Sequence, residues 1–148
     1  TEDGAYEVPE ELKEKIQSLF WAGCCGDDET KQTIGRVWQE HHYLCDTHTA
    51  VAWNVVQQYK TANPAHAPVV VLSTASPYKF PAAVLEGLGE KAEGDEFAVM
   101  EQLERLTGIP APKNLRGLRE RPVRHTTVLD REEMLPFVLE KAQEKKWF

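Results

Sequence analysis

An unbroken apolar run that ends in a cluster of hydroxyl side chains is the feature that most constrains the fold of this chain. The stretch from Pro68 to Phe80 reads PVVVLSTASPYKF, and its segment Val69–Leu72 is apolar and mostly β-branched. Such a run predicts a strand that is buried on both faces, as in a parallel sheet covered by helices. Pro77 prevents this strand from continuing in a central ladder. We therefore expect an α/β fold, with helices around a small, mostly parallel sheet.

Three hydroxyl side chains follow the expected strand at once: Ser73, Thr74 and Ser76. In open α/β sheets, ligands bind outside the carboxyl ends of the strands. Serine, threonine and proline are also ordinary turn residues. The residues alone therefore leave two interpretations open, a ligand site and a simple turn.

The length and charge of the chain restrict the classes of protein to which it can belong. Its 148 residues suit a single compact domain covering residues 1–148. The net charge is −7 and there is no basic block, so we expect neither nucleic acid nor an anionic membrane as a partner. Residues 1–15 are acidic and polar, unlike a secretory signal. We expect a cytoplasmic protein.

The cysteines and histidines do not form a recognisable disulfide or metal motif. The chain has three cysteines, two of them adjacent, which favours free thiols in a reducing cytosol. Metal-ligand types crowd together between residues 41 and 48, but their spacing matches no standard zinc site. The residues concerned are His41, His42, Cys45, Asp46 and His48. We expect no metal site.

Apolar residues at helical spacing predict that most of the chain is helical. The expected helices cover 10–20, 29–42, 49–61, 81–88, 95–106 and a last segment after the capping box of Asp130 and Glu133. A second strand is expected over Val123–Leu129. Two strands are few for an independent sheet, so we expect that part of the sheet is missing.

Two motifs carry a resemblance to a known family. Ser73–Phe80 (STASPYKF) resembles the late motif of threonine synthase, a pyridoxal-phosphate (PLP) enzyme of fold type II. Tyr43–Ala50 (YLCDTHTA) resembles the Tyr-Leu-Asp-Pro-His-Thr-Ala pattern of the same family, with Thr47 in place of the usual proline. Further similar segments lie at Asp3–Tyr6, Thr107–Pro112 and Arg121–His125. The resemblance covers essentially the whole chain, but only the C-terminal part of a much longer enzyme.

The resemblance implies a PLP-dependent lyase of threonine biosynthesis, which converts O-phospho-L-homoserine and water to L-threonine and phosphate. In fold type II enzymes, a serine or threonine hydroxyl group near the end of the chain faces the pyridine nitrogen of PLP. The motif position implies that Thr74 binds the cofactor, with Ser73 as the alternative. It also implies that His48, Ser76 and Lys79 lie near the substrate.

The resemblance also implies that the chain lacks part of the catalytic apparatus. The lysine that forms the Schiff base with PLP belongs to an N-terminal motif that is absent here, and Lys79 is better explained as a solvated lysine. The glycine-rich loop that cradles the PLP phosphate is absent too. We therefore assign no catalytic residue. We expect the chain alone to be inactive and to bind no PLP of its own, and we expect the N-terminal part of the enzyme as its partner. A start at Thr1, with no methionine before Met100, also fits a fragment.

Three alternatives remain open at this point. The chain could be a stand-alone, non-catalytic binding or interaction module derived from the same fold. It could also be a hydrolase that uses Ser73 or Ser76 with His48 and Asp46, although no Gly-x-Ser-x-Gly elbow is present. Finally, Asp46 could simply cap the helix that follows it.

Overall fold

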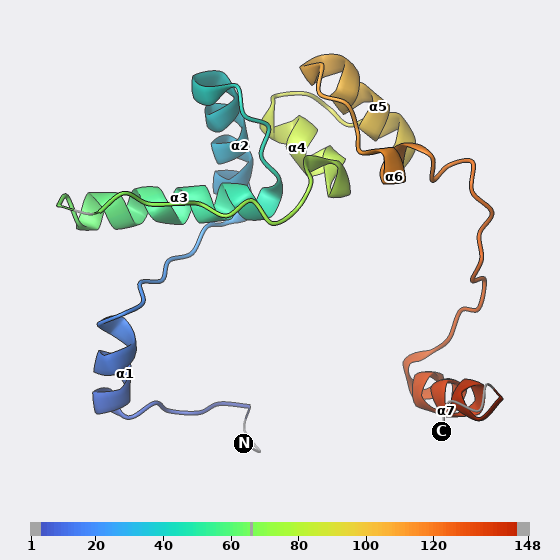
Figure 1. The fold of residues 1–148 in the computed structure, drawn as a ribbon, viewed down its shortest axis with the longest axis horizontal. Helices are drawn as coiled ribbons and strands as arrows, with labels where there is room; N and C mark the ends of the chain where they lie inside the picture. The colour runs from blue at the N-terminus through green and yellow to red at the C-terminus, as the bar shows by residue number, and fades with distance from the viewer. Residues whose placement is uncertain (1–3, 66, 145–148) are drawn as a thin grey trace. The chain divides into compact units, whose positions relative to one another are not determined.

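The computed structural model describes residues 4–65 and 67–144, which belong to two compact units, Thr1–Arg116 and Gly117–Phe148. The larger unit contains most of the helices, and Figure 1 labels the α-helices. They are α1 (Glu10–Gln17), α2 (Asp27–His41), α3 (Thr47–Ala62), η1 (Pro77–Lys79), α4 (Pro81–Gly87), α5 (Glu96–Thr107) and α6 (Lys113–Arg116). The smaller unit contains η2 (Arg131–Glu133) and α7 (Met134–Glu144).

The predicted sheet is wrong for the described part of the chain, where no residue forms a strand. Val69–Leu72 and Val123–Leu129 are both irregular segments, whereas the predicted helices are present. A strand forms only by pairing with another strand. An apolar, β-branched run shows a propensity for the strand conformation, but it does not show whether a second strand is available to pair with it. The described residues are therefore helical rather than α/β.

Four helices of the larger unit enclose the core. Ile34 and Val37 of α2 and Val84 and Leu85 of α4 are fully buried or nearly so, whereas Trp38 and Leu88 are half-buried and His41 is exposed. Leu103 of α5 is also fully buried. The apolar periodicity of these helices thus identified the faces that pack together.

Most helix ends lie where the sequence places them. Asp46 caps α3, and Asp95 caps α5 by accepting a hydrogen bond from the Ala98 amide at 2.9 Å. Gly108 ends α5 with φ of 69°, a left-handed conformation that glycine adopts readily. The N-cap residue of α2 is Gly26, whose amide donates a hydrogen bond to Glu29 at 2.9 Å.

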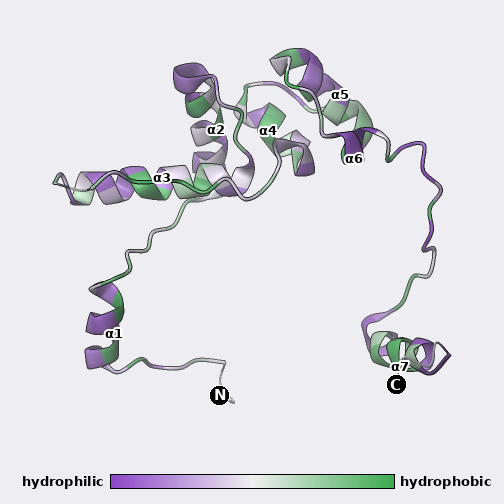
Figure 2. Cartoon of the chain, viewed as in Figure 1, coloured by the Kyte–Doolittle hydropathy of each residue, from purple (hydrophilic) through white to green (hydrophobic). Residues whose placement is uncertain are grey.

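Two amphipathic helices expose the apolar faces that they were expected to bury. In α7, Leu135, Val138 and Leu139 are all more than half exposed. In α1, Leu12 and Ile16 are also exposed. In Figure 2, the ribbons of both helices carry green, hydrophobic segments. Helices of this length are marginal in water without a packed apolar face.

Candidate functional site

Ser73, one of the predicted cofactor residues, is joined to the start of α3 by hydrogen bonds. The chain that leaves α3 runs back along this helix (Figure 1), which brings Ser73 to the N-terminal turn. The Ser73 Oγ atom lies 3.2 Å from Thr49 Oγ1 and accepts a hydrogen bond from the Tyr43 hydroxyl group at 3.0 Å. The hydroxyl group of Thr49 in turn donates to the Asp46 carboxylate.

Asp46 is the buried anion at the centre of this cluster, with a side chain that is 1% exposed. Its Oδ1 atom accepts hydrogen bonds from the amides of His48 at 2.9 Å and Thr49 at 3.3 Å. Burial would raise the pKa of Asp46, but the hydrogen bonds from Thr49 and His48, with the charge of His48, outweigh it and hold that pKa below its usual range. Asp46 is therefore ionised at neutral pH, and it caps α3 as the simplest interpretation predicts.

His48 lies on the other side of the same carboxylate. Its Nδ1 atom is 3.3 Å from Asp46 Oδ1, and its side chain is 61% exposed. Its ring centroid lies 5.7 Å from that of Phe80. The imidazole is thus held near a buried negative charge while it remains open to solvent.

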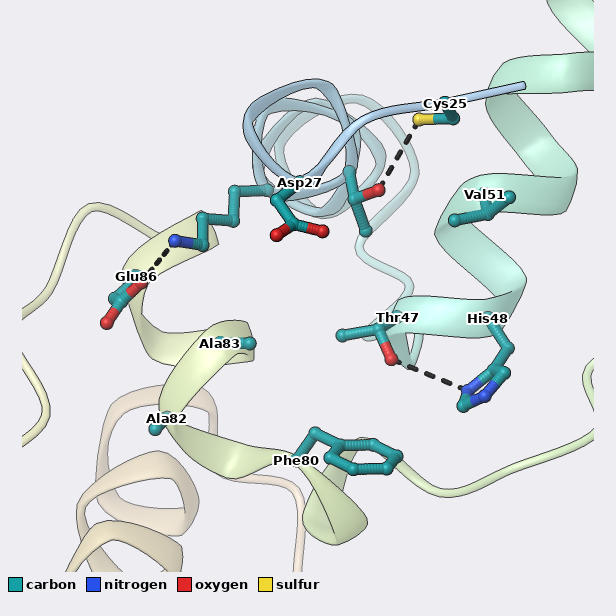
Figure 3. A pocket seen from close by; sticks show the side chains of 11 residues that line it. Cys25, Asp27, Thr47, His48, Val51, Phe80, Ala82, Ala83 and Glu86 are labelled. Carbon is teal, nitrogen blue, oxygen red and sulfur yellow. Dashed lines mark hydrogen bonds and ion pairs between the residues drawn. The ribbon is translucent and has the colours of Figure 1, made fainter.

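His48 also lines a cavity of about 590 Å³ between the first turns of α2, α3 and α4. Figure 3 shows Thr47, His48 and Phe80 on one side of this cavity, with Asp27 across from them. At its edge, Lys31 and Glu86 form an ion pair with an N–O distance of 2.6 Å. The walls therefore combine apolar surface with several polar and charged groups.

A second cavity of about 290 Å³ lies on the Ser73 side of the cluster. The hydroxyl-bearing side chains of Tyr43, Thr49 and Ser73 line part of it. The rest of the lining is mostly apolar and consists of Val37, Cys45, Trp53 and Val71. Burial raises the pKa of the Cys45 thiol to about 11, so this cysteine is protonated at neutral pH.

The other predicted site residues lie outside this hydrogen-bonded cluster. Thr74 is exposed, next to Ser73. Ser76 begins η1 by accepting a hydrogen bond from the Tyr78 amide at 3.3 Å. Lys79 ends η1 and is exposed. The structure thus brings Ser73 and His48 to opposite sides of Asp46, and the roles of all five predicted residues stay predictions.

Tyr43 and Thr49 belong to the cluster but were not predicted as site residues. The spacing of Asp46 and Thr49, three residues apart at a helix start, does indicate a cap. Nothing in that local pattern indicates that Thr49 also contacts a residue 24 positions away. The sequence pattern therefore indicates the local cap, but it does not indicate the long-range contact between Thr49 and Ser73.

The arrangement does not support a serine hydrolase. Such an enzyme needs the nucleophile within hydrogen-bond reach of its base. Ser73 instead contacts Tyr43 and Thr49, and no hydrogen bond joins Ser73 or Ser76 to His48 among the described residues.

Two further searches of the structure bear on metals and membranes. Within residues 4–65 and 67–144, no group of three or more histidine, cysteine or acidic side chains is placed to hold a metal ion. None of the helices in that part of the chain has the length and apolar character needed to cross a membrane.

Comparisons with known proteins give a consistent result. Residues 49–138 match the family model described as "Threonine synthase, C-terminal". Threonine synthase-like 2 of Homo sapiens is 37% identical over 78 residues, which cover 53% of this chain and 16% of the relative. Threonine synthase-like 1 of Mus musculus is 35% identical over 80 residues, which cover 54% of this chain and 10% of the relative. The chain therefore spans only a small part of the length of these relatives.

Proposed function

The chain belongs to the threonine synthase C-terminal family, and on that premise we propose that it forms one wall of a PLP-dependent active site. The proposed reaction of the complete enzyme converts O-phospho-L-homoserine and water to L-threonine and phosphate. The observation that carries the proposal is the position of the Ser73–Thr74 pair, which is anchored to the start of α3 while Thr74 remains exposed.

The chemistry of these side chains fits the pyridine ring of PLP. A ring nitrogen that carries no proton needs a hydrogen-bond donor, and the exposed hydroxyl group of Thr74 can supply one. The anionic Asp46 faces Thr49 and His48, so it is not the group offered to the ring. Bound PLP supplies an electron sink for the substrate. Thr74 would orient the ring through a neutral hydrogen bond.

His48 is the best candidate for a residue near the substrate. Its ring is exposed and lines the larger cavity, and the residue belongs to the first turn of α3. Ser76 and Lys79 remain weaker candidates, because Ser76 is engaged as the cap of η1. We assign none of these three residues a chemical step.

Other parts of the enzyme must supply the lysine that tethers PLP and the loop that binds its phosphate group. Exposed apolar side chains support this division, because Val70 and Leu72 are 82% and 73% exposed beside the Ser73–Thr74 pair. A soluble module that acts alone rarely exposes an apolar patch next to its site. We therefore prefer the enzyme to a stand-alone binding module, and we expect the isolated chain to be inactive. Its three free cysteines fit a cytosolic location.

Expression of the complete reading frame that encodes this chain tests the proposed function. The purified product would be incubated with PLP and O-phospho-L-homoserine, and threonine and inorganic phosphate would be measured. We expect equal amounts of both products, and we expect the Thr74→Val variant to bind PLP less tightly. A product that binds PLP but releases phosphate without threonine would overturn the proposed reaction while leaving the cofactor in place.

The isolated chain provides the complementary test. Mixed with PLP, it should develop no absorbance band of tethered cofactor that borohydride removes. Such a band would contradict the proposal, because it would mean that a lysine of this chain holds the cofactor.

A further inference from the structure

The segment that joins α1 to α2 lies against α3 and carries two adjacent cysteines. Residues 21–26 of this segment form no helix, and we call them the strap. The carbonyl oxygen of Cys24 accepts a hydrogen bond from the Gln58 side chain at 2.8 Å. The indole ring of Trp21 packs edge-on against Tyr59, with 5.6 Å between the ring centroids. These contacts attach the backbone around both cysteines to α3.

The attachment of the strap continues into the interior of the larger unit. The same Gln58 nitrogen donates to the Asn54 side chain at 2.7 Å, and Asn54 donates to Thr33 of α2 at 3.2 Å. Thr33 is buried. The Cys24 carbonyl group is therefore the outer end of a hydrogen-bonded row that joins the strap, α3 and α2.

The thiol groups of Cys24 and Cys25 are both within reach of a small oxidant. Cys24 is exposed, and Cys25 is half-buried. The Cys25 Sγ atom lies 3.4 Å from Thr30 Oγ1, and Figure 3 shows this side chain at the edge of the larger cavity. Redox-sensing cysteines are typically accessible and often lie next to a second cysteine that resolves the first product. Cys45 is buried, so accessibility and adjacency together distinguish Cys24 and Cys25 from it.

We propose that Cys24 and Cys25 form a redox-sensitive dithiol, which hydrogen peroxide converts to a disulfide within the chain. The Cys24 thiolate attacks one oxygen of the peroxide, so an S–O bond forms, the O–O bond breaks and hydroxide leaves. The Cys25 thiolate then attacks the Cys24 sulfur, so the S–S bond forms and the S–O bond breaks. The two thiols lose two electrons to the peroxide, and their two protons leave in the two water molecules that form. Nothing in this chemistry requires PLP.

Closing this disulfide should pull the Cys24 carbonyl group away from Gln58. Adjacent Cα atoms are about 3.8 Å apart, whereas the Cα atoms of disulfide-linked residues are usually about 4.4–6.8 Å apart. The peptide unit between the two cysteines must therefore reorient, and the Cys24 carbonyl group belongs to that unit. We expect the strap to detach from α3 and the Cys25 sulfur to leave Thr30. Because a strained disulfide is easily reduced, cellular thiols should reverse the change.

Peptide mass spectrometry of the complete 148-residue chain tests the chemistry. The reduced chain would be treated with hydrogen peroxide, its remaining thiols blocked with N-ethylmaleimide in urea, and the product digested with trypsin. Cys24 and Cys25 lie on one tryptic peptide, residues 16–31, and Cys45 lies on another. We expect the first peptide to lose two hydrogen atoms and to take up no maleimide, while Cys45 takes up one.

Single-cysteine variants and the reduced control complete this test. Dithiothreitol should restore both thiols, and Cys24→Ser and Cys25→Ser should each abolish the loss of two hydrogen atoms. A sulfinic acid on either cysteine or a disulfide between two chains, as the main product of the wild type, would overturn the proposal. Both thiols remaining reduced would overturn it as well, because in each of these cases the two sulfurs do not combine.

A second measurement tests the coupling between the dithiol and α3. If the disulfide breaks the hydrogen bond between Gln58 and Cys24, a chain that lacks this bond must oxidise more readily. Gln58→Ala should therefore shift the dithiol–disulfide equilibrium in glutathione buffers about fivefold toward the disulfide, the effect of one hydrogen bond. Gln58→Met keeps the length of the side chain without the donor and should give the same shift.

The neighbouring glutamine of α3 provides the matched control for this measurement. Gln57→Ala also removes an amide side chain, but it leaves the hydrogen bond from Gln58 to Cys24 in place, so the equilibrium should stay unchanged. An equilibrium that is the same in wild type and in folded Gln58→Ala and Gln58→Met would overturn the release of the strap. A shift of equal size in Gln57→Ala would overturn it too, because the effect would not depend on the hydrogen bond.

Discussion

Gly35 of α2 and Gly87 of α4 lie backbone to backbone where the two helices cross. A Cβ atom on residue 35 would collide with the carbonyl oxygen of Gly87, and one on residue 87 would lie 2.8 Å from the carbonyl oxygen of Lys31. Only glycine permits this approach at both positions. The crossing places Lys31 and Glu86 within 2.6 Å of each other at the edge of the larger cavity.

Gly35→Ala should therefore destabilise the larger unit. Alanine favours a helix by about 1 kcal/mol over glycine, but overpacking costs about 1–3 kcal/mol, and here the clash is with backbone that has no rotamer to change. We expect a net loss of stability, measured by urea unfolding. Gln32→Ala, on an exposed position of the same helix, is the control and should change stability by less than about 0.5 kcal/mol. An alanine variant as stable as the wild type would contradict the close crossing.

Asp46 should make the stability of the larger unit depend on pH in the acid range. Its pKa is lower in the folded chain than its ordinary value of about 3.9, so its contribution to stability is complete above that value. The contribution is lost as the pH falls from about 4 through the lowered folded pKa. Asp46→Asn should flatten this part of the curve of unfolding free energy against pH, whereas Thr49→Ser should preserve it. An equally steep loss in Asp46→Asn would assign the acid sensitivity to other groups.

Local patterns predicted the helices and their ends well, because the information they use is local. Asp95 and Gly108 mark the two ends of α5 by their own side-chain and backbone preferences. The prediction of a sheet was wrong because it depends on contacts that are not local. Val69–Leu72 has the composition of a strand, but a strand forms only when a second strand pairs with it. The candidate site divides in the same way. Asp46 was recognisable as a cap, whereas its connection to Ser73 through Thr49 depends on how the chain returns along α3.

Cys45 should resist alkylation while the chain is folded. Burial raises its pKa from 9.0 to about 11, which lowers its thiolate fraction at pH 8 about a hundredfold, and only the thiolate reacts. Cys24 is exposed and provides an internal comparison. Brief treatment with iodoacetamide followed by peptide mass spectrometry should label Cys24 and leave Cys45 unmodified until urea is added. Equal labelling of both cysteines in the native chain would mean that the core around Cys45 is open.

The segment Val69–Leu72 should become a strand when the rest of the proposed enzyme is present. Val71 lines the smaller cavity beside Trp53, while Val70 and Leu72 point outward and are 82% and 73% exposed. This alternation is that of a strand with one covered face. In the described part of the chain, no backbone hydrogen bond is found for this segment. Its amides are therefore available to pair with the edge of another strand.

Hydrogen–deuterium exchange tests this expectation. Amides of Val69–Leu72 should exchange within seconds in the isolated chain and at least about tenfold more slowly in the complete enzyme, because ladder hydrogen bonds protect them. Amides of Leu103 in α5 should be protected in both samples, since that helix is already packed. Val70→Asp should prevent the added protection but leave the stability of the isolated chain unchanged, whereas Val71→Asp should destabilise it. Slow exchange of this segment in the dilute isolated chain would show that its backbone is already paired, and no strand from elsewhere would then be needed.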